Sequence, residues 1–346
     1  MLTLDPIELD LAGWIDNLKR KATPKRVFYY EHAVDEGIQQ ELDERYGICE
    51  KLNRNRKDYA YLRTAAIHRF LGQELFRVFP DGSRINIPTK QGEWVEEGKG
   101  PVTTWEEFEQ FSWPRPEDMD MRVFDYYEHN LPDNMRVFIV TTVWEAVRDL
   151  IGFETFCYKL YDDREFIDSV FEKVGEFNLG IVNSLCDYDC LGAVLLSDDL
   201  GYKTSTFIEA KNIRELIIPW HKKLGDIPRR HGKYVLFHSC GQMYEVMDDY
   251  IDIVKIDAKH SFEEVVMPVA EVKKRYGDRL SLLGGMDVDL LARADEQTIR
   301  TKTRDILDGC FQGGGYFLGS GNWVTKYIPL DNYLVMLDEG RRYTSG

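Results

Sequence analysis

Short apolar runs alternate with segments of helical period from Met135 to the C-terminal region of the chain. This alternation is typical of βα units, whose strands lie parallel in one sheet. We expect strands, rich in Val, Ile and Leu, at residues 136–142, 193–197, 234–238, 253–257, 281–285 and 316–319. Helices are expected between and after them, at residues 164–183, 208–224, 262–275, 296–310 and 329–342.

Two further strands are predicted upstream, at residues 26–30 and 75–79. Eight strands that each lead into a helix would close a (β/α)8 TIM barrel, and 346 residues accommodate such an α/β barrel with additions. We therefore expect one domain over residues 1–346 with an N-terminal extension. Between about residues 80 and 133, turn residues and alternation at 84–87 predict a β-hairpin and loop insertion after the second strand. Its tryptophans either cover the barrel mouth or anchor the loop to the wall.

Composition limits the partners. The formal net charge of −16 and the pI of about 5.0 argue against a nucleic-acid partner, because nucleic acid is a polyanion. No run reaches the roughly 18 apolar residues of a membrane span, so no membrane partner is expected. The first residues lack the basic start and apolar stretch of a signal peptide, and the six cysteines lack small-scaffold spacing. A cytoplasmic protein with reduced thiols is predicted.

The predicted strand ends carry polar residues. In a barrel these ends surround one mouth, where active-site groups gather. The residues placed there are Glu31 and His32, Thr142 and Trp144, Asp198 and Asp199, His238 and Cys240, Asp257 and His260, Met286 and Asp287, and Ser320 and Asn322.

The segment His238-Ser239-Cys240-Gly241 ends one predicted strand. Side chains two apart on a strand point to the same face, so the imidazole and the thiol could bind a soft divalent metal together. A catalytic zinc needs three protein ligands and an open fourth position, so this pair is half of a site. Two other interpretations remain open: a buried cysteine that packs, and a histidine hydrogen-bonded inside the mouth.

Several motifs together resemble the uroporphyrinogen decarboxylase superfamily, and within it the zinc-dependent, corrinoid-linked methyltransferase branch. They are DDLG at 198–201, HSCG at 238–241, LGGMD at 283–287, GGGYFLGSG at 313–321 and PLDN at 329–332. The resemblance implies a barrel, a zinc ion bound by the H-x-C pair and a later cysteine, and methyl transfer to or from cobalt of a cobalamin (corrinoid) on a partner protein. At the position of that later cysteine this chain has Asn322, a poor zinc ligand.

The third zinc ligand is therefore open among Asp199, Asp257 and His260. We expect zinc on His238, Cys240 and Asp199. The motifs further suggest catalytic roles for Asp199, His260 and Asn322, and cofactor binding by Gly285, Asp287 and Ser320.

The predicted function is a zinc-assisted methyltransferase that moves a methyl group between a corrinoid protein and a small-molecule donor or acceptor. One alternative is a decarboxylase. That branch has an arginine-rich stretch after its first strand, where this chain has Glu31-His32-Ala33-Val34-Asp35. Another is a catalytically inactive barrel that binds a corrinoid protein or a small ligand.

Overall fold

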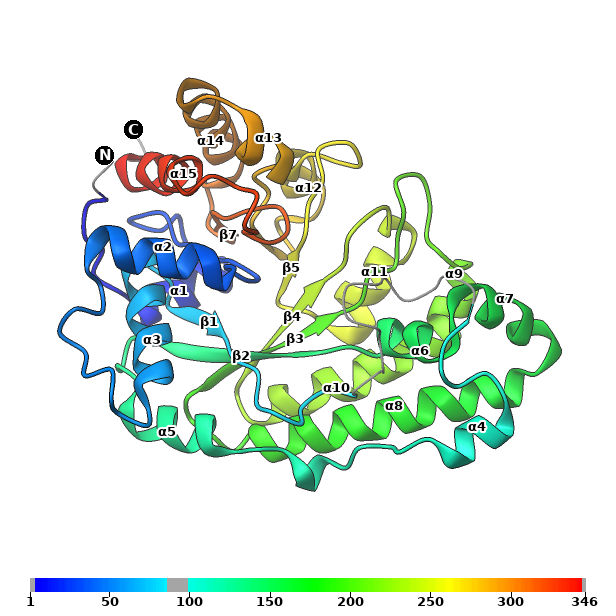
Figure 1. Ribbon diagram of the computed structural model, residues 1–346. Coiled ribbons are helices and arrows are strands. Elements are labelled where there is room, and N and C mark those ends of the chain that lie inside the picture. Colours follow the sequence, from blue (N-terminus) through cyan, green and yellow to red (C-terminus); the bar gives the residue numbers. More distant parts are fainter. Residues whose placement is uncertain (1–3, 86–98, 344–346) are drawn as a thin grey trace.

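The computed structural model describes residues 4–85 and 99–343, and its centre is a seven-stranded parallel sheet. Each strand pairs with the next one in the chain, and the sheet curls, with helices on its outer side (Figure 1). The strands are β1 (Leu75–Arg77), β2 (Arg136–Thr141), β3 (Leu191–Ser197), β4 (Tyr234–His238), β5 (Ala258–His260), β6 (Ser281–Leu283) and β7 (Tyr316–Phe317).

The helices are α1 (Leu11–Leu18), α2 (Glu36–Tyr46), α3 (Tyr59–Leu71), α4 (Trp105–Gln110), α5 (Arg122–Asn130), α6 (Trp144–Ile151), α7 (Phe153–Asp162), α8 (Arg164–Leu185), α9 (Ala210–Asn212), α10 (Ile218–Arg230), α11 (Met247–Asp249), α12 (Val269–Tyr276), α13 (Val288–Arg293), α14 (Glu296–Cys310) and α15 (Leu330–Arg342). Short 3-10 turns lie at Pro116–Asp118 and Tyr244–Val246, and π-helical turns at Ile213–Ile217 and Tyr250–Val254. No helix within the described ranges is long and apolar enough to cross a membrane.

The strand side chains alternate between two buried layers. In β3, Ala193 and Leu195 belong to an inner cluster, whereas Val194 and Leu196 belong to the cluster between sheet and helices. This is the two-residue period of a strand buried on both faces. The same parity puts Leu236 of β4 and Ala258 of β5 in the inner cluster. Two residues on, His238 and His260 therefore face the inside of the curl.

The strand predicted at residues 253–257 is wrong. Residues 250–254 form a π-helical turn whose Val254 packs in the outer cluster, and β5 begins only at Ala258. A short apolar run has no period by which a buried turn differs from a strand. The helix predicted at 262–275 likewise begins later, at Val269, and the one predicted at 208–224 comprises α9, a π-helical turn and α10.

The segment predicted as the first strand lies beside β7. Tyr29 bridges Leu318 in parallel, with hydrogen bonds from Leu318 N to Phe28 O (2.8 Å) and from Tyr30 N to Leu318 O (3.0 Å). This is the position expected of an eighth strand. Its closure onto β1 stays a prediction.

The segment at residues 80–133 is more helical than predicted, since it contains α4 and α5. The hairpin predicted at 84–87 extends into residues 86–98, which lie outside the described residues, as does Trp94. Trp105 packs edge-on against Phe166 of α8, with ring centroids 5.4 Å apart. The described part of the insertion is thus anchored to the outer helices.

Candidate metal centre and active site

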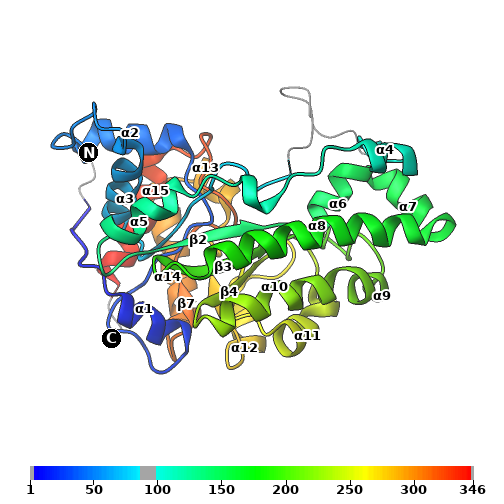
Figure 2. The same ribbon diagram turned by 90° about the horizontal axis from the view of Figure 1, so that it is seen from below.

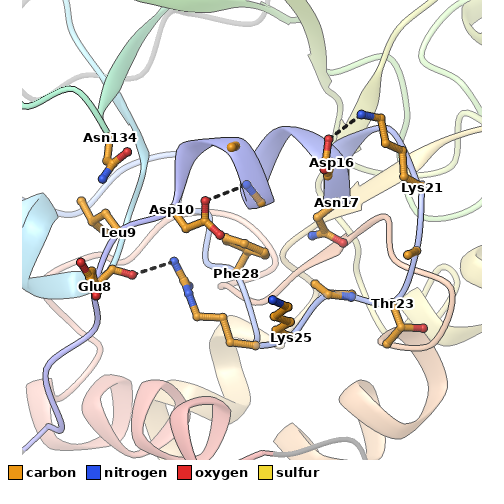
Figure 3. Close-up of a pocket in the computed structure, with 15 residues that line it drawn as sticks. Glu8, Leu9, Asp10, Asp16, Asn17, Lys21, Thr23, Lys25, Phe28 and Asn134 are labelled. Atoms are coloured by element: carbon orange, nitrogen blue, oxygen red, sulfur yellow. Dashed lines mark hydrogen bonds and ion pairs between the residues drawn. The ribbon is translucent and has the colours of Figure 1, made fainter.

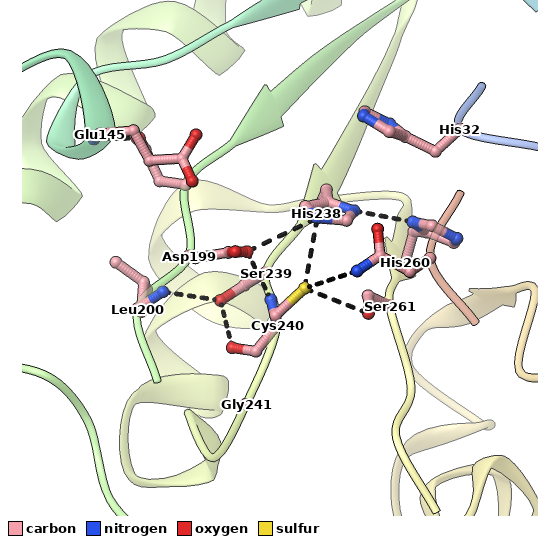
Figure 4. Close-up of polar contacts among 12 residues, drawn as sticks. His32, Glu145, Asp199, Leu200, His238, Ser239, Cys240, Gly241, His260 and Ser261 are labelled. Carbon is pink, nitrogen blue, oxygen red and sulfur yellow. Dashed lines mark hydrogen bonds and ion pairs between the residues drawn. The ribbon is translucent and has the colours of Figure 1, made fainter. Parts of the chain in front are cut away.

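Three side chains meet where β3 and β4 end. His238 is the last residue of β4, Cys240 follows it, and Asp199 lies in the loop after β3 (Figure 4). The Nε2 atom of His238 is 3.6 Å from Cys240 Sγ and 3.5 Å from Asp199 Oδ1. Asp199 Oδ1 also accepts a hydrogen bond from the Cys240 amide (2.7 Å), which fixes the carboxylate beside the thiol.

These separations fit a tetrahedral zinc site. Zinc binds sulfur at about 2.3 Å and nitrogen or oxygen at about 2.0–2.1 Å, so a tetrahedral angle separates S from N by about 3.6 Å and N from O by about 3.4 Å. The observed distances of 3.6 Å and 3.5 Å agree with both values. Three protein ligands leave a fourth position open, as catalysis at zinc requires.

His260 holds His238 in the tautomer that a metal requires. The Nε2 atom of His260 lies 3.2 Å from the carbonyl oxygen of Ser320, so it carries the proton and donates it. The Nδ1 atom of His260 then accepts from Nδ1–H of His238, at 2.8 Å. This leaves the lone pair of His238 on Nε2, the atom that faces Cys240 and Asp199.

A second cluster, His32, His238 and His260, also brings three possible ligand atoms within 4.8 Å of one another. It fits a cation less well. Burial lowers the pKa of His32 and His260 well below the ordinary value, so both are neutral donors of electron pairs. However, Arg77 Nη1 lies 3.2 Å from His32 Nε2, which places a positive charge where the metal would bind.

The electrostatics of the first cluster favour a cation. Burial and the Asp199 carboxylate raise the pKa of the Cys240 thiol far above its ordinary range. Burial opposes the ionised form of Asp199, but hydrogen bonds to the carboxylate, including that from the Cys240 amide, outweigh it and lower that pKa. Because a thiol binds metal as thiolate, a divalent cation would displace the Cys240 proton.

Asn322 occupies the place of the expected cysteine and contacts the sulfur directly. Its Nδ2 atom donates to Cys240 Sγ at 3.3 Å, and the Ser261 hydroxyl lies 3.5 Å from the same atom. Asn322 thus contacts the candidate ligand Cys240 rather than supplying a cysteine ligand of its own.

Lys259 lies behind this loop, fully buried. Its Nζ atom donates to the carbonyl oxygens of Ser239 (3.1 Å) and Ser261 (2.6 Å), which joins the two segments that carry Cys240 and Ser261. Burial lowers the pKa of Lys259 to about 8. Sequence reasoning missed this residue, because it lies in the segment 258–260 that was not predicted as a strand.

The two neighbouring aspartates have different environments. Asp198 is fully buried and accepts hydrogen bonds from the amides of Val143 (3.0 Å) and Glu145 (2.8 Å) at the start of α6. It also contacts His221 Nε2 at 2.6 Å, and His221 Nδ1 contacts the Tyr250 hydroxyl at 2.8 Å. Asp198 therefore ties α6 and α10 to the end of β3. His221, within a predicted amphipathic helix, gave no sequence signal.

Asp257 is wrong as a candidate third ligand. It precedes β5 and accepts a hydrogen bond from the Val235 amide (2.8 Å) at the start of β4. It therefore lies at the amino end of the sheet, and the error follows from the strand misplaced at 253–257.

The residues predicted to bind a cofactor have local partners. Asp287 caps α13 by accepting from the Leu290 amide (2.9 Å), and the Ser320 hydroxyl is buried against Glu31 Oε2 (2.5 Å). Gly285 has φ of 120°, and a Cβ there would collide with Val269. Their cofactor-binding role stays a prediction.

A cavity of about 460 Å³ adjoins the site. Its walls include Arg84, Val140, Thr142, Glu145 and Asn178, and Glu145 lies across from Asp199 in Figure 4. Burial and the charges of Asp199 and Asp198 raise the pKa of Glu145 to about 8. A larger cavity of about 780 Å³ is lined by residues 8–28 and Asn134, at the other end of the sheet (Figure 3). It is remote from His238 and Cys240.

The fold and the site define an α/β protein with a parallel sheet whose polar cluster lies at the carboxyl ends of the strands. The family model described as "Uroporphyrinogen decarboxylase (URO-D)" matches residues 60–343, and the chain belongs to this family. The description of the family model names a decarboxylase.

A solved structure and a curated protein resemble this chain to different extents. A solved structure named "methyltransferase from Methanosarcina mazei" superposes with a TM-score of 0.68 at 12% identity, covering 96% of this chain and 98% of the other. A uroporphyrinogen decarboxylase from Cupriavidus necator is 33% identical over 79 residues, which are 22% of either chain. The first likeness shows the fold, and the second is confined to less than a quarter of that enzyme's length.

Proposed function

We propose that the protein is a zinc-assisted methyltransferase that moves a methyl group between a corrinoid (cobalamin) protein and a small molecule. The observation that carries the proposal is the cluster of Asp199, His238 and Cys240, whose 3.5 Å and 3.6 Å separations suit one zinc ion. The likeness of the whole fold to a methyltransferase also supports this proposal.

Each residue of the site has a task in this proposal. Asp199, His238 and Cys240 would hold the metal, and zinc, when bound, supplies a Lewis acid that activates a thiol or polarises an oxygen. His260 keeps the His238 proton on Nδ1, and Asn322 stabilises the Cys240 sulfur by donating an N–H. Glu145, with a pKa of about 8, holds a proton beside the adjoining cavity and can give it to a leaving atom.

A decarboxylase is the second candidate, favoured by the short stretch of 33% identity. Decarboxylation gives no task to the Cys240 thiol or to the neighbouring imidazoles. Incubation with a porphyrinogen and measurement of released carbon dioxide separates the two candidates, because only the decarboxylase releases the gas.

Elemental analysis tests the metal directly. We expect about one zinc per chain, falling below roughly a tenth of that in Cys240→Ala, since one of three protein ligands is lost. The matched control is Cys310→Ala, which removes a buried thiol on α14 and should keep the zinc. Metal-free wild-type protein, or zinc that is indifferent to Cys240→Ala, would overturn the metal site.

Methyl transfer is followed by the absorption of added cob(I)alamin or methylcobalamin with candidate donors and acceptors. A spectral change that needs both the protein and its zinc is expected. Zinc binding without transfer, and without carbon dioxide release, would leave a barrel that only binds a ligand or a corrinoid protein.

A further inference from the structure

Two arginines contact one aromatic ring at the mouth. Arg77 is the last residue of β1, and its Cζ atom lies 4.5 Å from the Phe79 ring centroid. Arg84, at the exposed rim, has its Cζ atom 3.9 Å from the same centroid. Two positive charges are therefore held near the same ring, and the charge of Arg84 acts on Arg77.

No carboxylate neutralises this pair within the part of the chain that the structure describes. Neither arginine has an acidic oxygen within 4.0 Å; Asp35 and Glu145 act on them only from farther away. Burial and the charge of Arg84 lower the pKa of Arg77 to about 10, so it stays charged near neutral pH. By contrast, Arg300 binds both Asp338 and Glu339.

A third unsatisfied group adjoins the pair. Arg77 is always a donor, so His32 Nε2 accepts from it and the His32 proton resides on Nδ1. That Nδ1 atom is buried and has no hydrogen-bond partner among the described residues. Like charges removed from water and a buried donor without a partner both cost free energy, and an anion bound by the arginines offsets the first cost.

His32 contacts both Arg77 and the candidate metal ligand His238. The His32 ring stacks on His238 at a centroid distance of 4.7 Å. Trp323, next to Asn322, has its ring centroid 5.2 Å from Arg77 Cζ and 6.4 Å from that of His32. Flat apolar walls thus adjoin both the guanidinium groups and the site.

We infer that Arg77 and Arg84 bind a carboxylate of the small-molecule substrate, which is accordingly a small organic acid with an apolar body. Guanidinium groups match carboxylates with paired N–H donors, and the Trp323 and Phe79 rings would contact the apolar part. That this ligand is the methyl donor or acceptor rests on the proposed function.

Binding of benzoate, measured by calorimetry and by tryptophan fluorescence, tests the inference on the full-length protein. Arg77→Met and Arg84→Met should each weaken benzoate binding at least tenfold. The matched control Arg122→Met removes an exposed arginine of α5 and should leave the affinity within twofold. Benzamide, which has the same ring without the charge, should bind at least tenfold more weakly than benzoate.

The inference is overturned if benzoate binds both Met variants within twofold of wild type while circular dichroism shows them folded. Equal binding of benzamide overturns it too. Inorganic phosphate that binds and displaces benzoate would assign the arginines to a phosphate, such as that of a corrinoid, and would also contradict a substrate carboxylate.

Zinc binding and benzoate binding are measured separately, so that the two proposals can fail independently. Benzoate affinity that is unchanged in Cys240→Ala supports an anion site independent of zinc. If the wild-type protein contains no zinc but binds benzoate in a way that depends on Arg77, the proposed zinc-assisted methyl transfer is contradicted and the carboxylate site is supported.

Discussion

The two ends of the curled sheet differ in how their arginines are paired. At the amino end, α1 packs below the strands (Figure 2), and Asn17 donates to Tyr316 O (2.8 Å) while accepting from Gly315 N (2.9 Å). Ser281 donates to Leu18 O (2.7 Å), and Arg26 pairs with the buried Glu74. Each of these groups has at least one partner from the chain itself, whereas the buried Trp14 Nε1 atom and Glu74 Oε2 have none among the described residues.

At the carboxyl end, the corresponding groups lack such partners. Arg77 and Arg84 have no paired carboxylate among the described residues, His32 has an orphan N–H, and Cys240 has a thiol beside a carboxylate. The arginine at the amino end is therefore neutralised within the chain. The carboxyl end keeps arrangements that only a ligand would satisfy, as expected where a βα barrel holds its chemistry.

The largest expected effect is a loss of stability from a substitution at the amino end. Asn17→Ala should lower the free energy of unfolding by about 2–3 kcal/mol, because it leaves the buried Tyr316 carbonyl unpaired, while Gly315 N retains its bond to the Asn17 carbonyl. Chemical denaturation measures this. Zinc content should not change. In the control Asn130→Ala, an exposed side chain of α5, we expect less than about 0.5 kcal/mol. A loss of zinc in Asn17→Ala would break the comparison.

The second effect concerns metal affinity at the carboxyl end. His260→Phe removes the acceptor that fixes the His238 tautomer, and we expect zinc affinity to fall by about 10–100-fold in chelator competition. His260→Gln, whose amide can still accept, should recover part of the loss.

His68 supplies the matched control, since it is a buried histidine stacked on Phe76 and bonded to Gln73, away from the site. His68→Phe should keep wild-type zinc affinity. Equal affinities for His260→Phe and wild type would show that His260 does not position the ligand.

The smallest effect is a pH dependence at the carboxyl end. Burial raises the pKa of Glu31 from 4.5 to about 8, so the folded protein keeps this carboxyl neutral where the unfolded chain has ionised it. Its contribution to stability is therefore complete below about pH 4.5 and is lost as the pH rises through 8.

Glu31→Gln, which is neutral at every pH, should raise the melting temperature relative to wild type by about 2–5 °C at pH 8.5, and less at pH 5. Scanning calorimetry from pH 5 to 9 measures this difference. The exposed Glu176→Gln of α8 is the control and should show no such trend. A constant offset between Glu31→Gln and wild type would contradict the raised pKa.

The sequence by itself determined the parallel sheet and the paired side chains of one strand. The period of two placed His238 and Cys240 on one face, and the strands at 136–141 and 234–238 followed from apolar runs with clear ends. The proximity of Asp199 also followed, because neighbouring parallel strands end at the same edge.

The tertiary structure decided which groups meet across the mouth. The strand predicted at 253–257 ends where β5 has yet to begin, so Asp257 was wrongly placed at the mouth beside His260, because an apolar run marks burial but not the start of a strand. The contact between Asn322 and Cys240 joins residues 82 positions apart. The proximity of Arg77 and Arg84 depends on the path of the loop that brings both to the Phe79 ring. Local periodicity encodes which face a side chain takes, whereas packing of distant segments selects the atom that it contacts.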